Sequence, residues 1–153
     1  MSRVKYLLIA AVIVGAIAAL VAWNQRTLVA ALPPRIVCAN QTDARAQAGG
    51  DSAFPILGTG SMAPYIPAAP AGKDPMTTIV AYAKRDSRGF ADIKKGDLVS
   101  YSPKWAKGLV LHQAAEKTSS GWIMSGLHNP QSESWEPITE REFFALISAV
   151  YVW

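Results

Sequence analysis

An uncharged, proline-free run near the N-terminus constrains this chain more than any other feature. Over residues 6–23 it reads YLLIAAVIVGAIAALVAW, with an aromatic residue at each end. As an α-helix it would be about 27 Å long, close to the thickness of the hydrocarbon core of a bilayer. Arg3 and Lys5 precede the run, and basic residues favour the cytoplasmic side of a membrane. We therefore expect residues 1–5 in the cytoplasm, a single transmembrane anchor over 6–23, and the remaining chain outside the cytoplasm, attached to the cell membrane.

Two other interpretations of this run are less well supported. A cleavable secretory signal usually has an apolar region of about 7 to 15 residues, followed closely by a cleavage site of small residues. A helix buried in a soluble core usually has a polar face, and residues 6–23 have none. The length and the uniformity of the run favour a retained anchor.

The 153 residues leave room for one ordinary domain after the anchor, because domains of roughly 100 to 150 residues bury an adequate core. Residues 24–52 contain Pro33-Pro34, a polar run and no sustained apolar period. Such a segment is typical of a linker, and its lone Cys38 is then an ordinary thiol. We expect the folded domain over residues 53–153.

Short runs rich in β-branched and aromatic residues dominate this expected domain. They cover residues 77–84, 98–102, 108–116, 121–125 and 145–153, and turn-like clusters separate them. One segment, 137–144, has a helical pattern instead. Strands at this close spacing without intervening helices indicate antiparallel sheets or a small barrel. The expected fold class is therefore mainly β, with one N-terminal transmembrane helix.

Charge and side-chain inventory argue against two classes of function. The chain has 15 Lys and Arg and 11 Asp and Glu residues, and removal of the two anchor-flanking residues leaves 13 scattered basic ones. A nucleic-acid-binding protein would show a concentrated basic surface. One cysteine and two separated histidines provide no metal-ligand spacing. We expect no nucleic-acid partner, no metal and no cofactor.

The candidate catalytic residues are a serine on a glycine-rich loop and a histidine on a strand. Ser61 lies in GTGSMAPYIP (58–67), where two glycines permit a tight backbone turn. Taken alone, such a loop is usually a plain turn, and a serine hydroxyl needs a general base to become a nucleophile. His112, in LVLHQAAE, can serve without a large pKa shift, whereas a lysine would need deep burial. His128, on a loop, is the other histidine.

Four ordered motifs resemble those of the type I signal peptidases, membrane-anchored serine proteases that remove signal peptides from exported proteins. GTGSMAPYIP resembles the family's nucleophile box, Gly-x-Ser-Met-x-Pro. IKKGDLVSYSP (93–103) is similar to its Gly-Asp box before an apolar strand, and LVLHQAAE lies where the family has its general base. SGLHNPQSESWEPIT (125–139) resembles the late loop. The resemblance covers nearly the whole chain after residue 53.

The resemblance implies a role for each matching residue. Ser61 would attack the scissile carbonyl, and His112 would take its proton, as in the family members that carry histidine in place of lysine. The backbone N–H of Ser61 and the hydroxyl of Thr59 would stabilise the oxyanion. The implied substrates are the signal peptides of exported preproteins, cut after small residues. The family's nucleophile region lies against the membrane, so we expect exposed Tyr65 and Ile66 to contact membrane lipid.

The late loop departs from the family pattern. Where the family reads Gly-Asp-Asn, residues 126–128 read Gly-Leu-His, and Ser134 stands at the place of a later aspartate. Glu133 or Glu136 is then the candidate orienting acid. Loss of that acid in a related triad costs orders of magnitude in rate. The alternatives are a non-catalytic, membrane-tethered binding module on the same fold, a peptidase dedicated to a conjugation or pilus-type substrate, and a self-cleaving relative.

Overall fold

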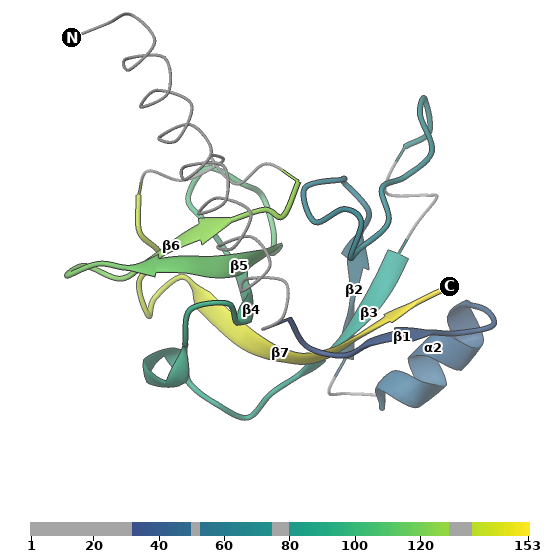
Figure 1. Ribbon diagram of the computed structural model, residues 1–153, viewed down its shortest axis with the longest axis horizontal. Coiled ribbons are helices and arrows are strands. Elements are labelled where there is room, and N and C mark those ends of the chain that lie inside the picture. Colours follow the sequence, from purple (N-terminus) through teal and green to yellow (C-terminus); the bar gives the residue numbers. More distant parts are fainter. Residues whose placement is uncertain (1–31, 50–52, 75–79, 129–135) are drawn as a thin grey trace, which may run out of the picture.

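Figure 1 shows the computed structural model, which describes residues 32–49, 53–74, 80–128 and 136–153. The elements in this part of the chain are β1 (Arg35–Val37), α2 (Gln41–Ala48), β2 (Ala53–Leu57), β3 (Val80–Arg85), the 3₁₀ helix η2 (Phe90–Asp92), β4 (Leu98–Tyr101), β5 (Val110–Lys117), β6 (Trp122–Ser125) and β7 (Phe143–Val152). The seven strands form one sheet. The prediction of a mainly β fold is confirmed.

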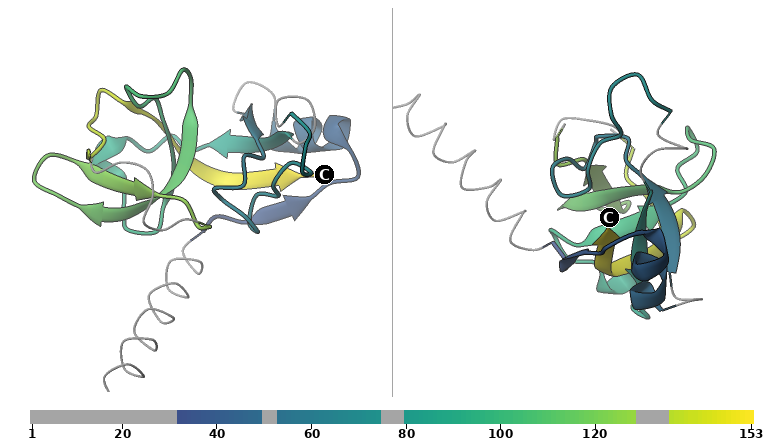
Figure 2. Two further views of the ribbon diagram at one scale, coloured as in Figure 1. Left: turned by 90° about the horizontal axis from the view of Figure 1, so that it is seen from above. Right: turned by 90° about the vertical axis from the view of Figure 1, so that its right-hand side faces the viewer.

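The long strand β7 connects two halves of this sheet. The strand order is β2-β3-β7-β4-β5-β6, and β1 also pairs with β7. The start of β7 pairs with β4, where Leu146 stands opposite Val99, and its end pairs with β3 and β1. All pairs are antiparallel except β1 with β7. Figures 1 and 2 show β4, β5 and β6 in one half and β1, β2, β3 and α2 in the other.

Strand β4 separates the two apolar clusters that carry most of the core. All four of its residues are buried, as expected for a strand covered on both faces. Leu98 belongs to a cluster with Ile56, Met62, Ile66 and Leu111. The other cluster contains Val99, Tyr101, Ala114, Trp122, Met124 and Leu146. Because side chains alternate along a strand, His112, the register partner of Val99 on β5, lies on the face of the second cluster.

The prediction of a linker over residues 24–52 is wrong for its second half. β1 pairs in parallel with β7, and α2 packs beside β3 and β7. Asn40 caps α2 by accepting a hydrogen bond from the Asp43 N–H, and Gly49 ends the helix with a φ of 83°. Cys38, predicted to be an ordinary linker thiol, is buried in a third apolar cluster with Ala44, Ala48, Tyr82, Ala149 and Tyr151. Small residues make this helix compatible with close packing although its sequence is polar.

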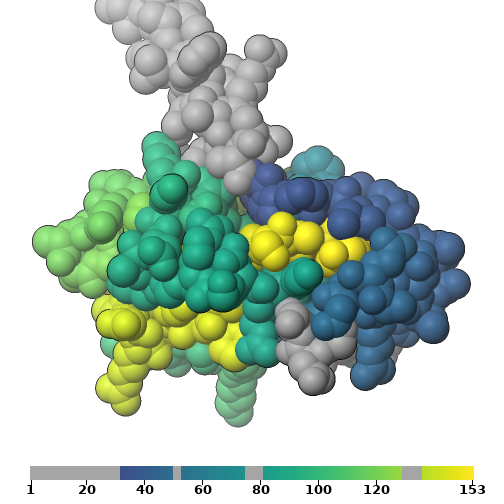
Figure 3. Space-filling model, turned by 90° about the horizontal axis from the view of Figure 1, so that it is seen from below, coloured from purple at the N-terminus to yellow at the C-terminus, as the bar shows by residue number. Residues whose placement is uncertain are grey.

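Other predicted boundaries need smaller corrections. The helical pattern of residues 137–144 is wrong: a turn precedes Phe143, which begins β7. β2 was not among the predicted strands, while the other predicted strands differ from β3, β4, β5, β6 and β7 by a few residues at their ends. In Figure 3, part of the yellow C-terminal segment lies between the teal and the blue parts of the molecule, consistent with the central position of β7.

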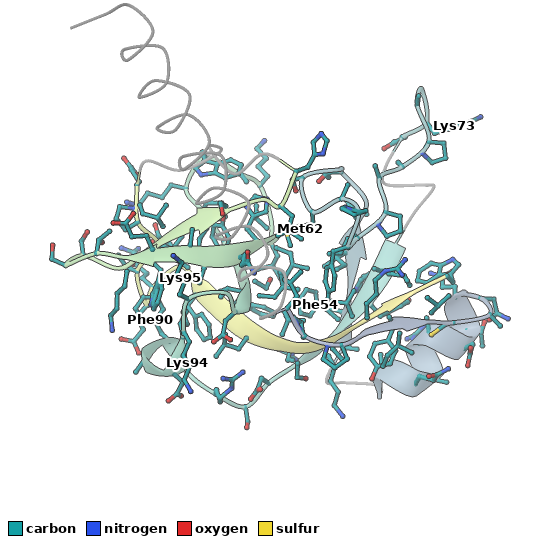
Figure 4. The ribbon with its side chains drawn as sticks, viewed as in Figure 1. Phe54, Met62, Lys73, Phe90, Lys94 and Lys95 are labelled. Carbon is teal, nitrogen blue, oxygen red and sulfur yellow. The ribbon has the colours of Figure 1, made fainter. Side chains whose placement is uncertain are left out.

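The predicted membrane contacts of the Pro-rich segment after Ser61 are also corrected. Ile66 is 3% exposed and belongs to the first core cluster. Tyr65 is half-buried, and its hydroxyl donates a hydrogen bond to the Pro33 carbonyl at 2.6 Å. The outer end of this segment, with Lys73, projects away from the sheet (Figure 4). The predicted anchor over 6–23 lies outside the described residues, and within them no helix is long and apolar enough to span a bilayer.

Candidate active site

The loop that carries Ser61 follows β2 and comprises residues 58–66; we call it the Ser61 loop. Gly60 adopts a φ of 93°, a conformation that glycine accepts far more readily than other residues. The carbonyl of Gly60 accepts a hydrogen bond from the Ala63 N–H at 3.0 Å. Met62 and Ile66 are each 3% exposed and anchor the loop in the first core cluster. The tight turn at Gly60 and the buried side chains of Met62 and Ile66 together fix the backbone on both sides of Ser61.

The chain directly after β6 holds the other side of the Ser61 loop. The carbonyl oxygen of Ser61 accepts a hydrogen bond from the His128 N–H at 3.0 Å. Gly126 lies so close that a Cβ atom there would stand 2.5 Å from the same oxygen. Glycine at position 126 therefore permits an approach of two backbones that a side chain would prevent. Figure 4 shows Met62, the neighbour of Ser61, in the space between β5 and β2.

His112 connects the Ser61 loop to β4. Its Nε2 lies 3.1 Å from Ser61 Oγ, and its Nδ1 lies 3.1 Å from the hydroxyl of Tyr101. The imidazole is 2% exposed, and this burial lowers its pKa from 6.5 to about 4, because desolvation disfavours the charged form. The ring is consequently neutral at neutral pH. A neutral imidazole beside a serine hydroxyl is the arrangement that general-base catalysis requires.

Thr59 places a second hydroxyl beside that of Ser61, the candidate nucleophile. Its Oγ1 lies 3.4 Å from Ser61 Oγ, a long hydrogen bond in which either atom can donate. Thr59 is exposed at the mouth of the site, whereas His112 is buried behind it. An exposed hydroxyl at this position can donate its proton to an incoming carbonyl oxygen in place of Ser61 Oγ.

A cleft of about 930 Å³ opens beside Ser61 and His112. Its walls come from β2, from the Ser61 loop and from the connection between β4 and β5. Most of its side chains are apolar, among them Phe54, Ile56, Met62, Ile66, Leu109 and Leu111. Lys107 adds a cation to the wall, and Trp105 is 56% exposed at the rim. β2 is the terminal strand in the strand order, so among the described residues no further strand pairs with its outer edge.

The other residues predicted for the site lie apart from this centre or outside the description. Glu133 lies outside the described residues. Glu136 is exposed to solvent just before Pro137, and the side chain of His128 is exposed as well. Two lysines lie on the connection between β4 and β5: Lys104 approaches Glu142 at 3.9 Å, and Lys107 lines the cleft. The nitrogen closest to Ser61 Oγ among these candidates is His112 Nε2.

Tyr101 is the site residue that sequence reasoning missed. It ends β4, and its register partner on β5 is Val110, two positions from His112. Residues two apart on a strand share a face, so Tyr101 and His112 are diagonal neighbours. The motif IKKGDLVSYSP contains Tyr101, but the sequence does not give the register between β4 and β5. That register is what places Tyr101 beside His112.

Comparisons with protein-family models, with curated proteins and with solved structures find no match. Within the ranges that the structure describes, no cluster of His, Cys, Asp and Glu is suited to hold a metal ion.

Proposed function

We propose that this protein is a membrane-anchored serine endopeptidase of the signal peptidase type, which cleaves the signal peptides of exported preproteins. The observation that carries the proposal is the 3.1 Å contact between Ser61 Oγ and His112 Nε2. A nucleophile and a base at hydrogen-bond distance, on a glycine-rich loop beside a cleft, are the parts that acyl transfer needs. The four motifs that resemble the signal peptidases point to the same chemistry.

In the first half of the reaction, Ser61 Oγ attacks the scissile carbonyl carbon while His112 Nε2 takes the hydroxyl proton. The negative charge that develops on the carbonyl oxygen is stabilised by the Ser61 N–H and the Thr59 hydroxyl. His112 then gives its proton to the leaving amine, and the C–N bond breaks to leave an acyl ester on Ser61. In the second half, water attacks this ester, His112 takes the water's proton, and Ser61 regains it.

The cleft fits an extended peptide better than a compact ligand. The four β2 residues Phe54–Leu57 line it, and β2 is an edge strand with β3 as its sheet neighbour. An extended substrate can add to such an edge through main-chain hydrogen bonds, while alternate side chains enter the cleft. Its apolar walls suit the uncharged end of a signal peptide. The anchor expected over residues 6–23 would keep the site next to the membrane in which that peptide sits.

The test is cleavage of an exported precursor by the full-length protein in detergent. Mass spectrometry of the product identifies the bond that is cut. Ser61→Ala and His112→Ala are each expected to lower kcat/KM by about 10³-fold or more, because nucleophile and base act as a unit. Ser120→Ala, an exposed serine on the turn between β5 and β6, is the matched control. Cleavage that survives both active-site substitutions would refute the assignment. Precursor binding without cleavage would identify a binding module instead.

A further inference from the structure

The side chain of Lys107 is the one ionised group among the described residues that line the cleft. The other lining residues are apolar, small or carry hydroxyls, and His112 is neutral at neutral pH. We propose that Lys107 is a specificity-determining residue that binds the carboxylate of an acidic side chain in the peptide substrate. The proposal rests on the function proposed above, because it assigns a substrate preference to the same cleft.

The connection between β4 and β5, which carries Lys107, is held at its start by two hydrogen bonds. The N–H of Ser102 donates to the Glu142 carbonyl at 2.8 Å, and the Pro103 carbonyl accepts from the Ala106 N–H at 3.2 Å. Pro103 is also buried. The resulting turn directly precedes Lys107, so the backbone of this residue has a defined place beside the cleft.

The charge of Lys107 has no other task in the described part of the molecule. Within the described residues, no carboxylate forms an ion pair with it. Lys104, on the same connection, instead lies 3.9 Å from Glu142 and is not among the described residues that line the cleft. Burial accounts for the low pKa of His112, so the Lys107 ammonium is not needed to keep that base neutral. The ammonium is therefore available to a ligand, and an anionic side chain is its electrostatic complement.

Apolar side chains next to Lys107 distinguish it from an isolated surface lysine. Trp105, two positions earlier, is 56% exposed, and Leu109, two positions later, is 45% exposed. Both line the cleft together with Lys107. A peptide that covers them displaces water from around the ammonium, and a charge pair is stronger where less water screens it. An acidic residue of the peptide then gains a partner, whereas an uncharged one leaves the cation partly desolvated.

Sequence separation limits where the acidic residue of the substrate can lie. Lys107 precedes His112 by five positions. Five residues of fully extended chain span at most about 17 Å, and an extended substrate covers that span in about five residues as well. The lysine side chain adds several ångströms of reach. We therefore expect the acidic residue within about six residues of the scissile bond.

The test compares peptides that span the signal-peptide junction of an exported precursor and carry Glu or Gln at one position within this reach. At about 0.1 M salt, we expect at least one Glu peptide to have a KM about fivefold lower than its Gln counterpart, as for a partly exposed ion pair. The kcat should be unchanged, because the carboxylate is remote from the reacting atoms. Lys107→Met is expected to abolish this preference. Lys104→Met, an equal loss of charge on the same connection, is the matched control and should keep it.

Equal KM values for the Glu and Gln peptides at every position would overturn the proposal. A Lys107→Met loss that is the same for both peptides would do so as well, because it would reveal a purely structural role. Salt screens an exposed ion pair, so the preference of the wild-type protein should disappear at about 1 M salt. A preference that persists there overturns the proposal even if the variants do not fold.

Failure of the proposed function is distinguishable from failure of this inference. A protein that cleaves no precursor refutes the function. The preference for Glu is then measured as peptide binding, by the anisotropy of a neutral fluorophore on the same peptides. A protein that cleaves the precursor but does not distinguish Glu from Gln refutes the role of Lys107 alone.

Discussion

Replacement of Gly126 by alanine tests whether the contact between two backbones sets the position of the nucleophile. The backbone of Gly126 is outside the left-handed region, so alanine can adopt it, and space alone decides the outcome. The new Cβ would stand 2.5 Å from the Ser61 carbonyl oxygen, against at least 3.4 Å for an ordinary contact. Ser61 and Gly126 must therefore separate by about 0.9 Å, which stretches the hydrogen bond from the His128 N–H.

A displacement of about 1 Å at a reacting atom can cost about 10²-fold in rate, or about 2.7 kcal/mol. The same overpacking is expected to lower the free energy of unfolding by about 1 to 3 kcal/mol. Precursor cleavage measures the loss of rate, and urea denaturation measures the loss in free energy of unfolding. Gly89→Ala is the control, because its Cβ meets its nearest atom at an ordinary 3.9 Å, from Asp92. If Gly126→Ala keeps the wild-type kcat and stability, the claim that this contact positions Ser61 is wrong.

Three further changes have defined outcomes. Thr59→Val is expected to lower kcat by about 10²-fold at unchanged KM if the hydroxyl is an oxyanion donor, and an unchanged kcat in the cleavage assay would remove it from that role. Burial lowers the pKa of His112 from 6.5 to about 4, so the unfolded chain binds the extra proton between these pH values. Urea denaturation should therefore show the free energy of unfolding falling by about 3 kcal/mol as pH drops through this window, and His112→Gln should flatten that slope. Tyr65→Phe loses the 2.6 Å hydrogen bond to Pro33 and should destabilise the fold by about 1 kcal/mol in the same measurement. No loss of stability would show that this bond contributes nothing.

The strands were predictable where the sequence has a run of apolar residues long enough to be recognised as a strand. β7 is long and rich in β-branched and aromatic residues, so its composition located it. β5 has one β-branched residue, Val110, and was located by the apolar run at its start between two turn-like segments. β1 has three residues and α2 has eight, mostly polar ones, which are too few for a periodic signal. Their packing depends on small buried residues such as Ala44 and Ala48, which pattern reasoning does not distinguish from linker alanines.

The pairing of Ser61 with His112 was predicted from a resemblance of motifs, and the structure places the two side chains within hydrogen-bond distance. The group at the other side of the imidazole was sought among acids, because a carboxylate is the familiar partner of a catalytic histidine. Tyr101 was overlooked because its contact with His112 depends on the register of two strands. A single sequence fixes the face of a residue on its strand but does not fix which residue of the neighbouring strand lies beside it.

The position of β7 in the sheet has a consequence for when this protein can act. The Ser61 loop follows β2, while His112 lies on β5, and β3, β7 and β4 stand between them in the strand order. β7 is the last described strand along the chain, so we expect Ser61 and His112 to come together only after it has inserted. Their distance is thus a property of the completed sheet, and a partly folded or truncated chain carries both residues without a working pair. Folding itself would then delay the proposed proteolytic activity until the domain is assembled.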